Sequence, residues 1–293
     1  MNRIIEYNIT SEYNGYNSEE YLRNLGYSSK LMRSIKLAEN GIMVNGAFQF
    51  ANIKLCEGDH LRVYIPEDAS SDFKPVSYSL DIAYEDEDLI IVNKPANMPI
   101  HPSMGNYENT LGNAIVDYFK DRPDGFVFRC INRLDRDTSG LTIIAKNPLS
   151  GVLLSSMQKE RKIKRTYQAI VRGIITKEGT IDAPIAREND SVIKRCVSGN
   201  GDLAITHYSP IKTKGNLSLI ELKLETGRTH QIRVHMKHIG YPLIGDFLYN
   251  PDDLELINRQ ALHSYKLEFT HPITDKELTI TAPLPKDMAN IIY

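Results

Sequence analysis

The stretch INRLDRDTSG, from Ile131 to Gly140, places two arginines and two aspartates directly before the apolar run LTIIAK, from Leu141 to Lys146. The apolar run predicts a buried strand, because most of its residues are aliphatic or β-branched. Charges that adjoin a buried strand need partners, since an unpaired buried charge is costly. The charged stretch is therefore interpreted as part of a site rather than as a solvated loop.

The 293-residue chain has the composition of an ordinary globular protein, with 41% hydrophobic and 25% charged residues. Its formal net charge of -2 means that a nucleic-acid partner must be held by a local basic patch. Cys56, Cys130 and Cys196 are odd in number and widely spaced, which favours a reducing compartment over a disulfide framework or a metal site. No segment approaches the roughly 20 apolar residues of a membrane span, and the first residues lack the apolar core of a signal peptide. We therefore expect a cytoplasmic protein without a membrane anchor.

The clearest boundary in the chain is a polar segment over residues 65–79, which contains Pro66 and Pro75 and is typical of a linker. Before it, Ser18 and Ser28 are expected to cap two short helices, and an Asn-Gly turn is expected to join two strands. These elements predict a small α/β module over about residues 12–75. The second domain is expected to cover residues 80–293.

Strands dominate the second domain, and helices occur among them without a regular β-α-β alternation. NTLGNAIVDYFK and PLSGVLLSSMQKE have helical spacing, whereas RTYQAIVRG and LIELKLET alternate as strands do. This arrangement predicts an α+β fold with a mixed, largely antiparallel sheet.

Several blocks occur in the order seen in one enzyme family. They are RLDRDTSG, TYQAIVRG and TGRTHQIRVH, together with NKPANMPIHP, TLGNAIVDYF, IDAPIAR, YPLIGDFLY, ALHSYKLEFTHP and APLP. In these blocks the chain resembles the RluA-type pseudouridine synthases of the RluD-like kind, over essentially all of the sequence from Asp81 onward. The first module resembles, more loosely, an S4 RNA-binding domain. The resemblance implies a pseudouridine synthase fold and an isomerase that converts uridine in RNA to its C-glycoside isomer without cofactor or metal.

That reaction breaks the bond between N1 of uracil and C1′ of ribose and joins C5 in its place. A carboxylate can act as the nucleophile or stabilise a cationic sugar. The resemblance assigns this role to Asp135, with Arg233 as the cation that keeps it ionised. It implies that Tyr167 stacks on the base and assists proton removal at C5, and that Arg133 holds the flipped-out nucleotide. Whether the carboxylate attacks the sugar or the base is left open.

Further residues are expected to touch RNA. A basic run from Lys159 to Arg165 predicts a phosphate-facing loop. Thr229 is expected to open a helix on which His230, Arg233 and Lys237 share one basic face. The substrate contacts expected near the site are Arg133, Asn132, Arg228, His230, Lys164 and Arg165. Those expected on the S4-like module are Arg23, Lys30, Arg33 and Lys36.

Two positions depart from the family pattern. Asn132 stands where most members have His, so a proton-handling role there is doubtful while a structural one survives. Asn97 stands where the family usually has Gly, and Asn is the residue besides Gly that best tolerates left-handed backbone angles. Neither position changes Asp135, so we expect an active enzyme.

Other interpretations of the same residues remain. LDRDTS is similar to the nucleophile loop of a metal-dependent phosphohydrolase, but that loop should follow an apolar strand, and here the strand comes afterwards. Asp137 is expected to cap a turn through an Asx interaction. A zinc site on HQIRVHMKH is disfavoured, because His230 and His235 are not one helical turn apart. An inactive RNA-binding or assembly factor is the alternative outside enzymology. Large-subunit ribosomal RNA is the expected substrate, transfer RNA stays open, and we expect a monomer.

Overall fold

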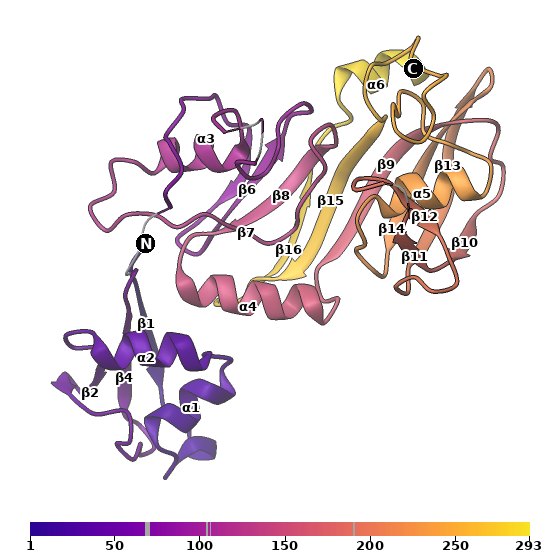
Figure 1. Ribbon diagram of the computed structural model, residues 1–293. Helices are drawn as coiled ribbons and strands as arrows, with labels where there is room; N and C mark the ends of the chain where they lie inside the picture. Colours follow the sequence, from indigo (N-terminus) through magenta and orange to yellow (C-terminus); the bar gives the residue numbers. More distant parts are fainter. Residues whose placement is uncertain (68–70, 104, 106, 190) are drawn as a thin grey trace.

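The structure is a computed structural model that describes residues 1–67, 71–103, 105, 107–189 and 191–293 (Figure 1). The first elements are β1 (Arg3–Asn8), a 3-10 helix (Ser11–Tyr13), α1 (Ser18–Asn24), α2 (Ser29–Leu37), β2 (Ile42–Val44), β3 (Ala47–Phe48) and β4 (His60–Ile65). They are followed by β5 (Ile82–Glu85), β6 (Leu89–Lys94), α3 (Leu111–Tyr118), β7 (Arg129–Cys130), β8 (Ser139–Ala145), α4 (Pro148–Lys159) and β9 (Lys164–Arg172). The remaining elements are β10 (Gly179–Asp182), β11 (Ile185–Arg187), β12 (Arg195–Val197), β13 (Ile205–Lys214), β14 (Leu217–Leu224), α5 (Gln231–His238), β15 (Leu262–Thr270), β16 (Glu277–Thr281) and α6 (Lys286–Ile292).

The N-terminal module is a small antiparallel sheet with strand order β1-β4-β2-β3 and two helices packed against it. The predicted Asn-Gly turn joins β2 to β3, with positive φ at both Asn45 and Gly46, as a tight hairpin requires. β1 pairs with β4 along its whole length, so the sheet includes a strand before residue 12, the expected start of the module. Ile5 and Ile9 enter the core of the module, which explains why this first segment belongs to it.

The two helices of the module begin at side-chain caps. Ser28 caps α2 by accepting a hydrogen bond from the backbone N–H of Leu31, as predicted. The cap of α1 is Asn17 instead of Ser18, and Asn17 and Glu20 form a reciprocal capping box. Ser18 is the first helical residue, and its hydroxyl donates to the carbonyl of Ala51.

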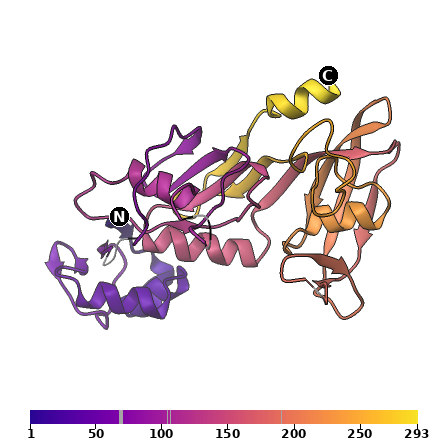
Figure 2. The same cartoon turned by 45° about the horizontal axis from the view of Figure 1, so that its top comes forward.

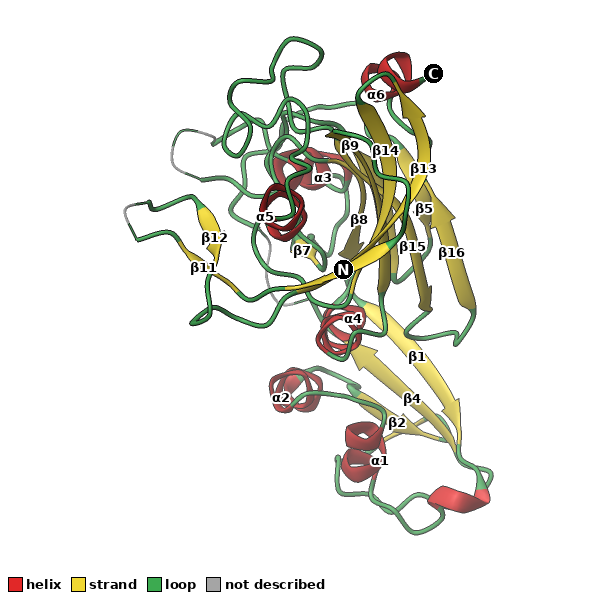
Figure 3. Cartoon of the chain, turned by 90° about the vertical axis from the view of Figure 1, so that its right-hand side faces the viewer, coloured by secondary structure: helices red, strands yellow, loops and turns green. Residues whose placement is uncertain are grey.

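Within the described residues, the second domain is built on a ten-stranded sheet with strand order β10-β13-β14-β9-β15-β8-β6-β5, to which β16 and β7 are attached by β15 and β8. β15 and β8 run parallel, and the other neighbours are antiparallel. The predicted mixed, largely antiparallel α+β fold is therefore confirmed. In Figure 3 the helices α3, α4 and α5 lie on one side of this sheet.

The apolar run after the charged stretch forms β8 in the centre of this sheet, and every residue of β8 is buried. β8 is held by β6 on one side and β15 on the other. The charged residues before it are thus anchored to the most buried part of the domain. In the turn after β6, Asn97 adopts a left-handed φ of 58°, as its identity predicted.

The module docks beside α4, as Figure 2 shows. Leu149 of α4 is fully buried within the hydrophobic core of the module, and Leu153 packs against the same core. The two units therefore share apolar contacts. No helix within the described residues has the length and apolar character needed to cross a membrane.

Candidate active site

Two segments far apart in the sequence meet at Asp135. This residue lies in the loop between β7 and β8, where its carbonyl accepts a hydrogen bond from the backbone N–H of Thr138. Nη1 of Arg233, on α5, donates to Oδ2 of Asp135 at 3.1 Å. The Arg233 side chain is 3% exposed, whereas that of Asp135 is 30% exposed. The carboxylate is therefore held by a buried cation while it remains open to a substrate.

A second carboxylate fixes the orientation of that cation. Oδ2 and Oδ1 of the fully buried Asp246 accept hydrogen bonds from Nε and Nη2 of Arg233 at 2.7 Å and 2.8 Å. Burial alone would lower the pKa of Arg233, but its hydrogen bonds and ion pairs with Asp246 and Asp135 raise the pKa above its ordinary value. Arg233 is thus permanently charged and points one N–H at Asp135.

His230 flanks the same carboxylate. Its Nε2 lies 3.8 Å from Oδ2 of Asp135, and its Nδ1 lies 2.9 Å from the hydroxyl of Tyr249. The carboxylate of Asp135 can only accept, so the tautomer of neutral His230 with its proton on Nε2 suits this neighbour. The Tyr249 hydroxyl can then donate to Nδ1 while it accepts the backbone N–H of Arg195. Burial lowers the pKa of His230, and the nearby charge of Asp135 opposes the shift while that of Arg233 adds to it. His230 is therefore neutral around pH 7 and offers an N–H to the site.

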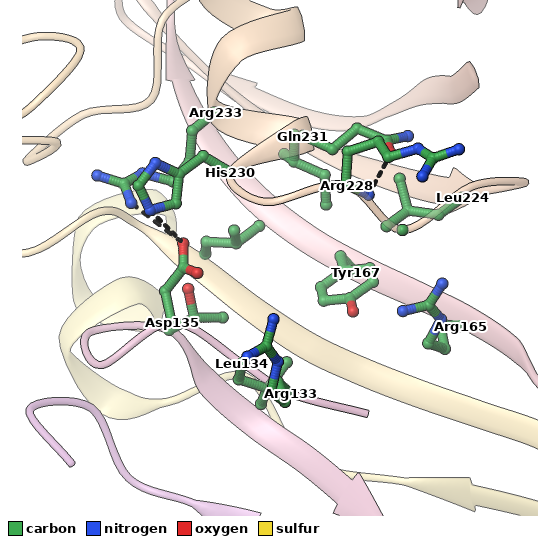
Figure 4. Close-up of a pocket in the computed structure, with 14 residues that line it drawn as sticks. Arg133, Leu134, Asp135, Arg165, Tyr167, Leu224, Arg228, His230, Gln231 and Arg233 are labelled. Atoms are coloured by element: carbon green, nitrogen blue, oxygen red, sulfur yellow. Dashed lines mark hydrogen bonds and ion pairs between the residues drawn. The ribbon is translucent and has the colours of Figure 1, made fainter. Parts of the chain in front are cut away.

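These groups open onto an inner pocket of about 90 Å³ between β9, α5 and the Asp135 loop (Figure 4). Tyr167 of β9 is 5% exposed and faces this pocket between Asp135 and Arg165. Leu134, Leu224, Ile232 and Leu262 give the pocket an apolar wall, while Arg133, Arg165 and Arg228 stand around it. A flat, partly apolar group that carries a negative charge nearby fits this lining.

Two of the expected substrate contacts lie outside this lining. Asn132 is 1% exposed, and its amide donates to the carbonyl of Leu141 and accepts the N–H of Ile143. It therefore ties the charged stretch to β8 and has a structural position, because both ends of its amide are used by the backbone. Lys164 is exposed at the start of β9 and alternates in direction with Arg165, so only Arg165 faces the pocket.

The helix that carries Arg233 does not begin as predicted. α5 begins at Gln231, and its N-cap is His230, with φ of 58°, rather than Thr229. Gln231 fixes this start, since its Oε1 accepts from the hydroxyl of Thr226 and the N–H of Arg228, and its Nε2 donates to Ile205. Arg233 is buried, yet the expected basic face is present, because His230, Arg233 and Lys237 all lie against the ring of Tyr249. Ile232, Met236 and Ile239 belong to a separate hydrophobic cluster.

The expected RNA-binding residues outside the pocket are partly balanced by acids. In the basic run, Lys162 pairs with Glu160, and Arg161 approaches Glu225 at 3.9 Å. On the module, Arg23 and Lys36 both pair with Glu19. Lys30 and Arg33 are exposed on α2, and neither has an acidic partner among the described residues. Of the four residues expected to contact RNA on the module, Lys30 and Arg33 are thus the two without an acidic partner among the described residues.

The structure gives little support to the alternative interpretations of these residues. The carboxylate of Asp137 accepts from Arg136, so it forms an ion pair instead of the expected Asx turn. Within the described part of the chain, the group that could gather a metal is Asp86, Asp88 and His271, which does not include Asp135. His235 is fully buried and bonded to Thr206 and Ala183, away from His230. The phosphohydrolase and zinc interpretations thus lack a ligand set at the site.

Asp246 and Tyr249 were not identified from the sequence as site residues. Both lie in YPLIGDFLY, one of the blocks on which the family resemblance rests, but the sequence suggested no role for either side chain. The available signal was an aspartate directly after the apolar run PLIG, since a carboxylate in such a setting requires a cation. Nothing in the sequence identifies Arg233 as that cation.

Comparison with known proteins gives a consistent result. The family described as RNA pseudouridylate synthase matches residues 88–238. An uncharacterized RNA pseudouridine synthase of Bacillus subtilis, YjbO, is 41% identical over 278 residues, which cover 94% of this chain and 97% of that protein. The ribosomal large subunit pseudouridine synthase D of Escherichia coli is 36% identical, over 87% of this chain and 83% of its own. The solved human RNA pseudouridylate synthase domain containing 1 superposes with a TM-score of 0.60 at 27% identity, over 72% of this chain and 86% of its own.

Proposed function

The chain belongs to the RNA pseudouridylate synthase family, and from this we propose that it isomerises specific uridines of large-subunit ribosomal RNA to pseudouridine in the cytoplasm. Members of this family are isomerases that act on uridine in RNA. The choice of ribosomal RNA is supported by relatives from several bacteria that carry the name ribosomal large subunit pseudouridine synthase D.

The observation that carries the proposal is the ion pair between Asp135 and the buried Arg233, at the edge of a pocket lined by Tyr167. The arginine holds the carboxylate through one charge-assisted hydrogen bond, and the carboxylate stays partly exposed to the pocket. Such a carboxylate can attack the nucleotide or stabilise positive charge on the ribose while the N1–C1′ bond breaks. Uracil then stays in the pocket, turns, and forms the new bond from C5 to C1′.

The other side chains have supporting roles in this scheme. Tyr167 provides the face on which the uracil rests and a hydroxyl that can relay a proton, since C5 loses one proton and N1 gains one as the isomer forms. Arg133 is exposed and has no acidic partner among the described residues, so it is available to the phosphate of a flipped-out nucleotide. The neutral His230 supplies an N–H beside Asp135 and completes the polar end of the pocket.

The test is an Asp135→Asn variant. We expect it to bind RNA and to form pseudouridine at least about 10³-fold more slowly than the wild type, because the reacting carboxylate is removed while the fold is kept. Tritium release from RNA labelled at C5 of uridine measures the rate, and mapping of pseudouridine in total RNA from cells with and without the gene identifies the target.

The same charged stretch provides a matched control. Asp137→Asn removes a neighbouring carboxylate that pairs with Arg136, and it should keep the rate within a few-fold of the wild type. Full activity in Asp135→Asn would contradict the assignment of the nucleophile. An unchanged pseudouridine map of ribosomal RNA in cells without the gene would contradict the proposed substrate.

A further inference from the structure

A second, outer pocket adjoins the one that holds Tyr167. Its volume is about 510 Å³. The residues that it shares with the inner pocket are Arg133, Leu134, Asp135, Arg165, Gly227, Arg228 and His230. Its remaining lining includes Pro99, Ile100, His101, Ile131, Gln158 and Thr229, which have no task in the chemistry at Asp135. A ligand that extends from the inner pocket past Asp135 would therefore enter this outer pocket.

One wall of the outer pocket suits a flat ring. Ile100 and Ile131 are apolar, and the imidazole of His101 is held edge-on by Phe128, with ring centroids 5.1 Å apart. Burial lowers the pKa of His101 and the charge of Arg133 adds to the shift, so the ring is neutral around pH 7. Neutral aromatic and apolar surfaces of this kind are those on which unpaired bases stack.

Two other residues of the outer pocket contain polar atoms without partners among the described residues. Oε1 of Gln158, on α4, and Nε of Arg165 are buried, and neither has a hydrogen bond among the described residues. The guanidinium of Arg165 also lacks a carboxylate partner within the described part of the chain, and it lies against Gly227, where a Cβ would come within 2.9 Å of Nη2. Buried donors and acceptors without partners are uncommon, and both residues line the outer pocket.

From these observations we propose that the outer pocket binds the base of the nucleotide next to the target uridine, and that Gln158 is the residue that recognises this base. The inference rests on the proposed function, because it requires a uridine in the inner pocket. An amide provides one donor and one acceptor, which suits the edge of a base, whereas a phosphate would require a cation at that position. Arg133 and Arg165 stand between the two pockets, where the linking phosphate would lie.

The experiment uses a pool of RNA stem-loops with a fixed uridine and randomised flanking nucleotides in the loop. Sequencing of the modified members gives relative kcat/KM values for the full-length wild type and its variants. We expect the wild type to prefer certain bases at one flanking position by about tenfold, and Gln158→Leu to lose that preference there and nowhere else. Gln158→Glu keeps the acceptor and removes the donor, so it should shift the preference towards bases that present an amino group.

Gln168→Leu is the matched control, because Gln168 lies on β9 outside both pockets and should leave the whole profile unchanged. A profile of Gln158→Leu identical to that of the wild type would overturn the proposal. An equal loss on every sequence would also overturn it, since it would place the target's own ribose or phosphate in the outer pocket. If the wild type modified no member of the pool and no cellular RNA, the proposed function itself would fail, which is a different result.

Discussion

Arg233 contacts two carboxylates and divides its donors unequally between them. Asp246 accepts from Nε and Nη2, so a single N–H from Nη1 is directed at Asp135. A guanidinium can satisfy both acids at once because its donors form a rigid planar fork, whereas an ammonium is a point charge. Asp135 is thereby held by one N–H, and the exposed part of its carboxylate stays available to the nucleotide.

Lys94 lies behind the same loop and presents an unusual titration. It is fully buried at the end of β6, and its ammonium donates to the carbonyls of Pro95, Met98 and Arg136. Burial lowers its pKa from 10.5 to about 7, against the opposing charges of Asp137 and Asp135. Between these values the folded chain has released this proton while the unfolded chain still binds it, so the free energy of unfolding should rise with pH.

We therefore predict that the stability difference between the wild type and Lys94→Met increases in favour of the wild type from about pH 7 to pH 10. The slope should be at most about 1.4 kcal/mol per pH unit, and below pH 6 the difference should be constant. Urea denaturation at a series of pH values measures it. Loss of the Lys94 hydrogen bonds lowers the stability of Lys94→Met by the same amount at every pH. A stability difference that stays constant from about pH 7 to pH 10 would therefore contradict the prediction.

At the scale of single residues, the sequence indicates chemistry more readily than contacts. Asp135, Tyr167 and Arg233 were named from ordered blocks, and the structure brings all three to one pocket. Asn132 was expected to touch the substrate, yet its amide is bonded to the backbone of β8. A short polar side chain serves either purpose, and the choice depends on the direction of a backbone turn that residue identity does not determine.

At the scale of elements, the Asp135 loop depends on a parallel junction between β8 and β15. Gly140 pairs with Ser264 there, at φ of 112°, and a Cβ at Gly140 would lie 2.3 Å from the carbonyl oxygen of Ser264. We predict that Gly140→Ala destabilises the fold by at least about 3 kcal/mol, since both the backbone angle and the close approach disfavour a side chain.

Thermal and urea denaturation measure this effect, and Gly199→Ala is the control, because it has a φ outside the left-handed range and open space around its Cα. Loss of stability in Gly140→Ala should be accompanied by loss of pseudouridine formation, since the loop before β8 carries Asp135. If Gly140→Ala had wild-type stability, the two strands β8 and β15 could move apart at this position without loss of stability, which would contradict the prediction.

The sequence predicted the helices and strands better than it predicted which of them pack or pair with one another. The helices over Leu111–Tyr118 and Pro148–Lys159 follow from the local spacing of their apolar residues, and they appear where expected. The insertion of β15 between β8 and β9 is a long-range pairing, which depends on how whole strands pack and leaves no local signal. The start of α5 was misplaced for a related reason. It is fixed by Gln231, whose side chain donates a hydrogen bond to the carbonyl of the distant Ile205, and not by a conventional cap.

At the scale of the whole molecule, the position of the module determines how the exposed cations of α2 are placed relative to Asp135. Among the described residues, Arg3 and Arg129 form ion pairs across the boundary between the units with the buried carboxylates of Asp88 and Glu67. Nε of Arg3 donates to Asp88 at 2.9 Å, and Arg129 makes two hydrogen bonds of 2.7 Å to Glu67. Leu149 adds an apolar contact in the core of the module. RNA that spans both units would therefore contact cations of α2 that are held at a defined position relative to Asp135.

Arg129→Ala tests whether charge pairing contributes to this arrangement. Glu67 is 3% exposed, and after the substitution its remaining charged partner would be the amino group of Met1, 2.8 Å away. We therefore expect the free energy of unfolding to fall by about 3 kcal/mol, the lower end for a broken buried ion pair. The module should then detach more often, seen as faster proteolysis within residues 71–81 and a larger radius in X-ray scattering. Arg62→Ala, which removes a half-exposed pair at 3.8 Å from Glu6, should change neither. Wild-type behaviour of Arg129→Ala would mean that apolar contacts such as that of Leu149 hold the two units without it.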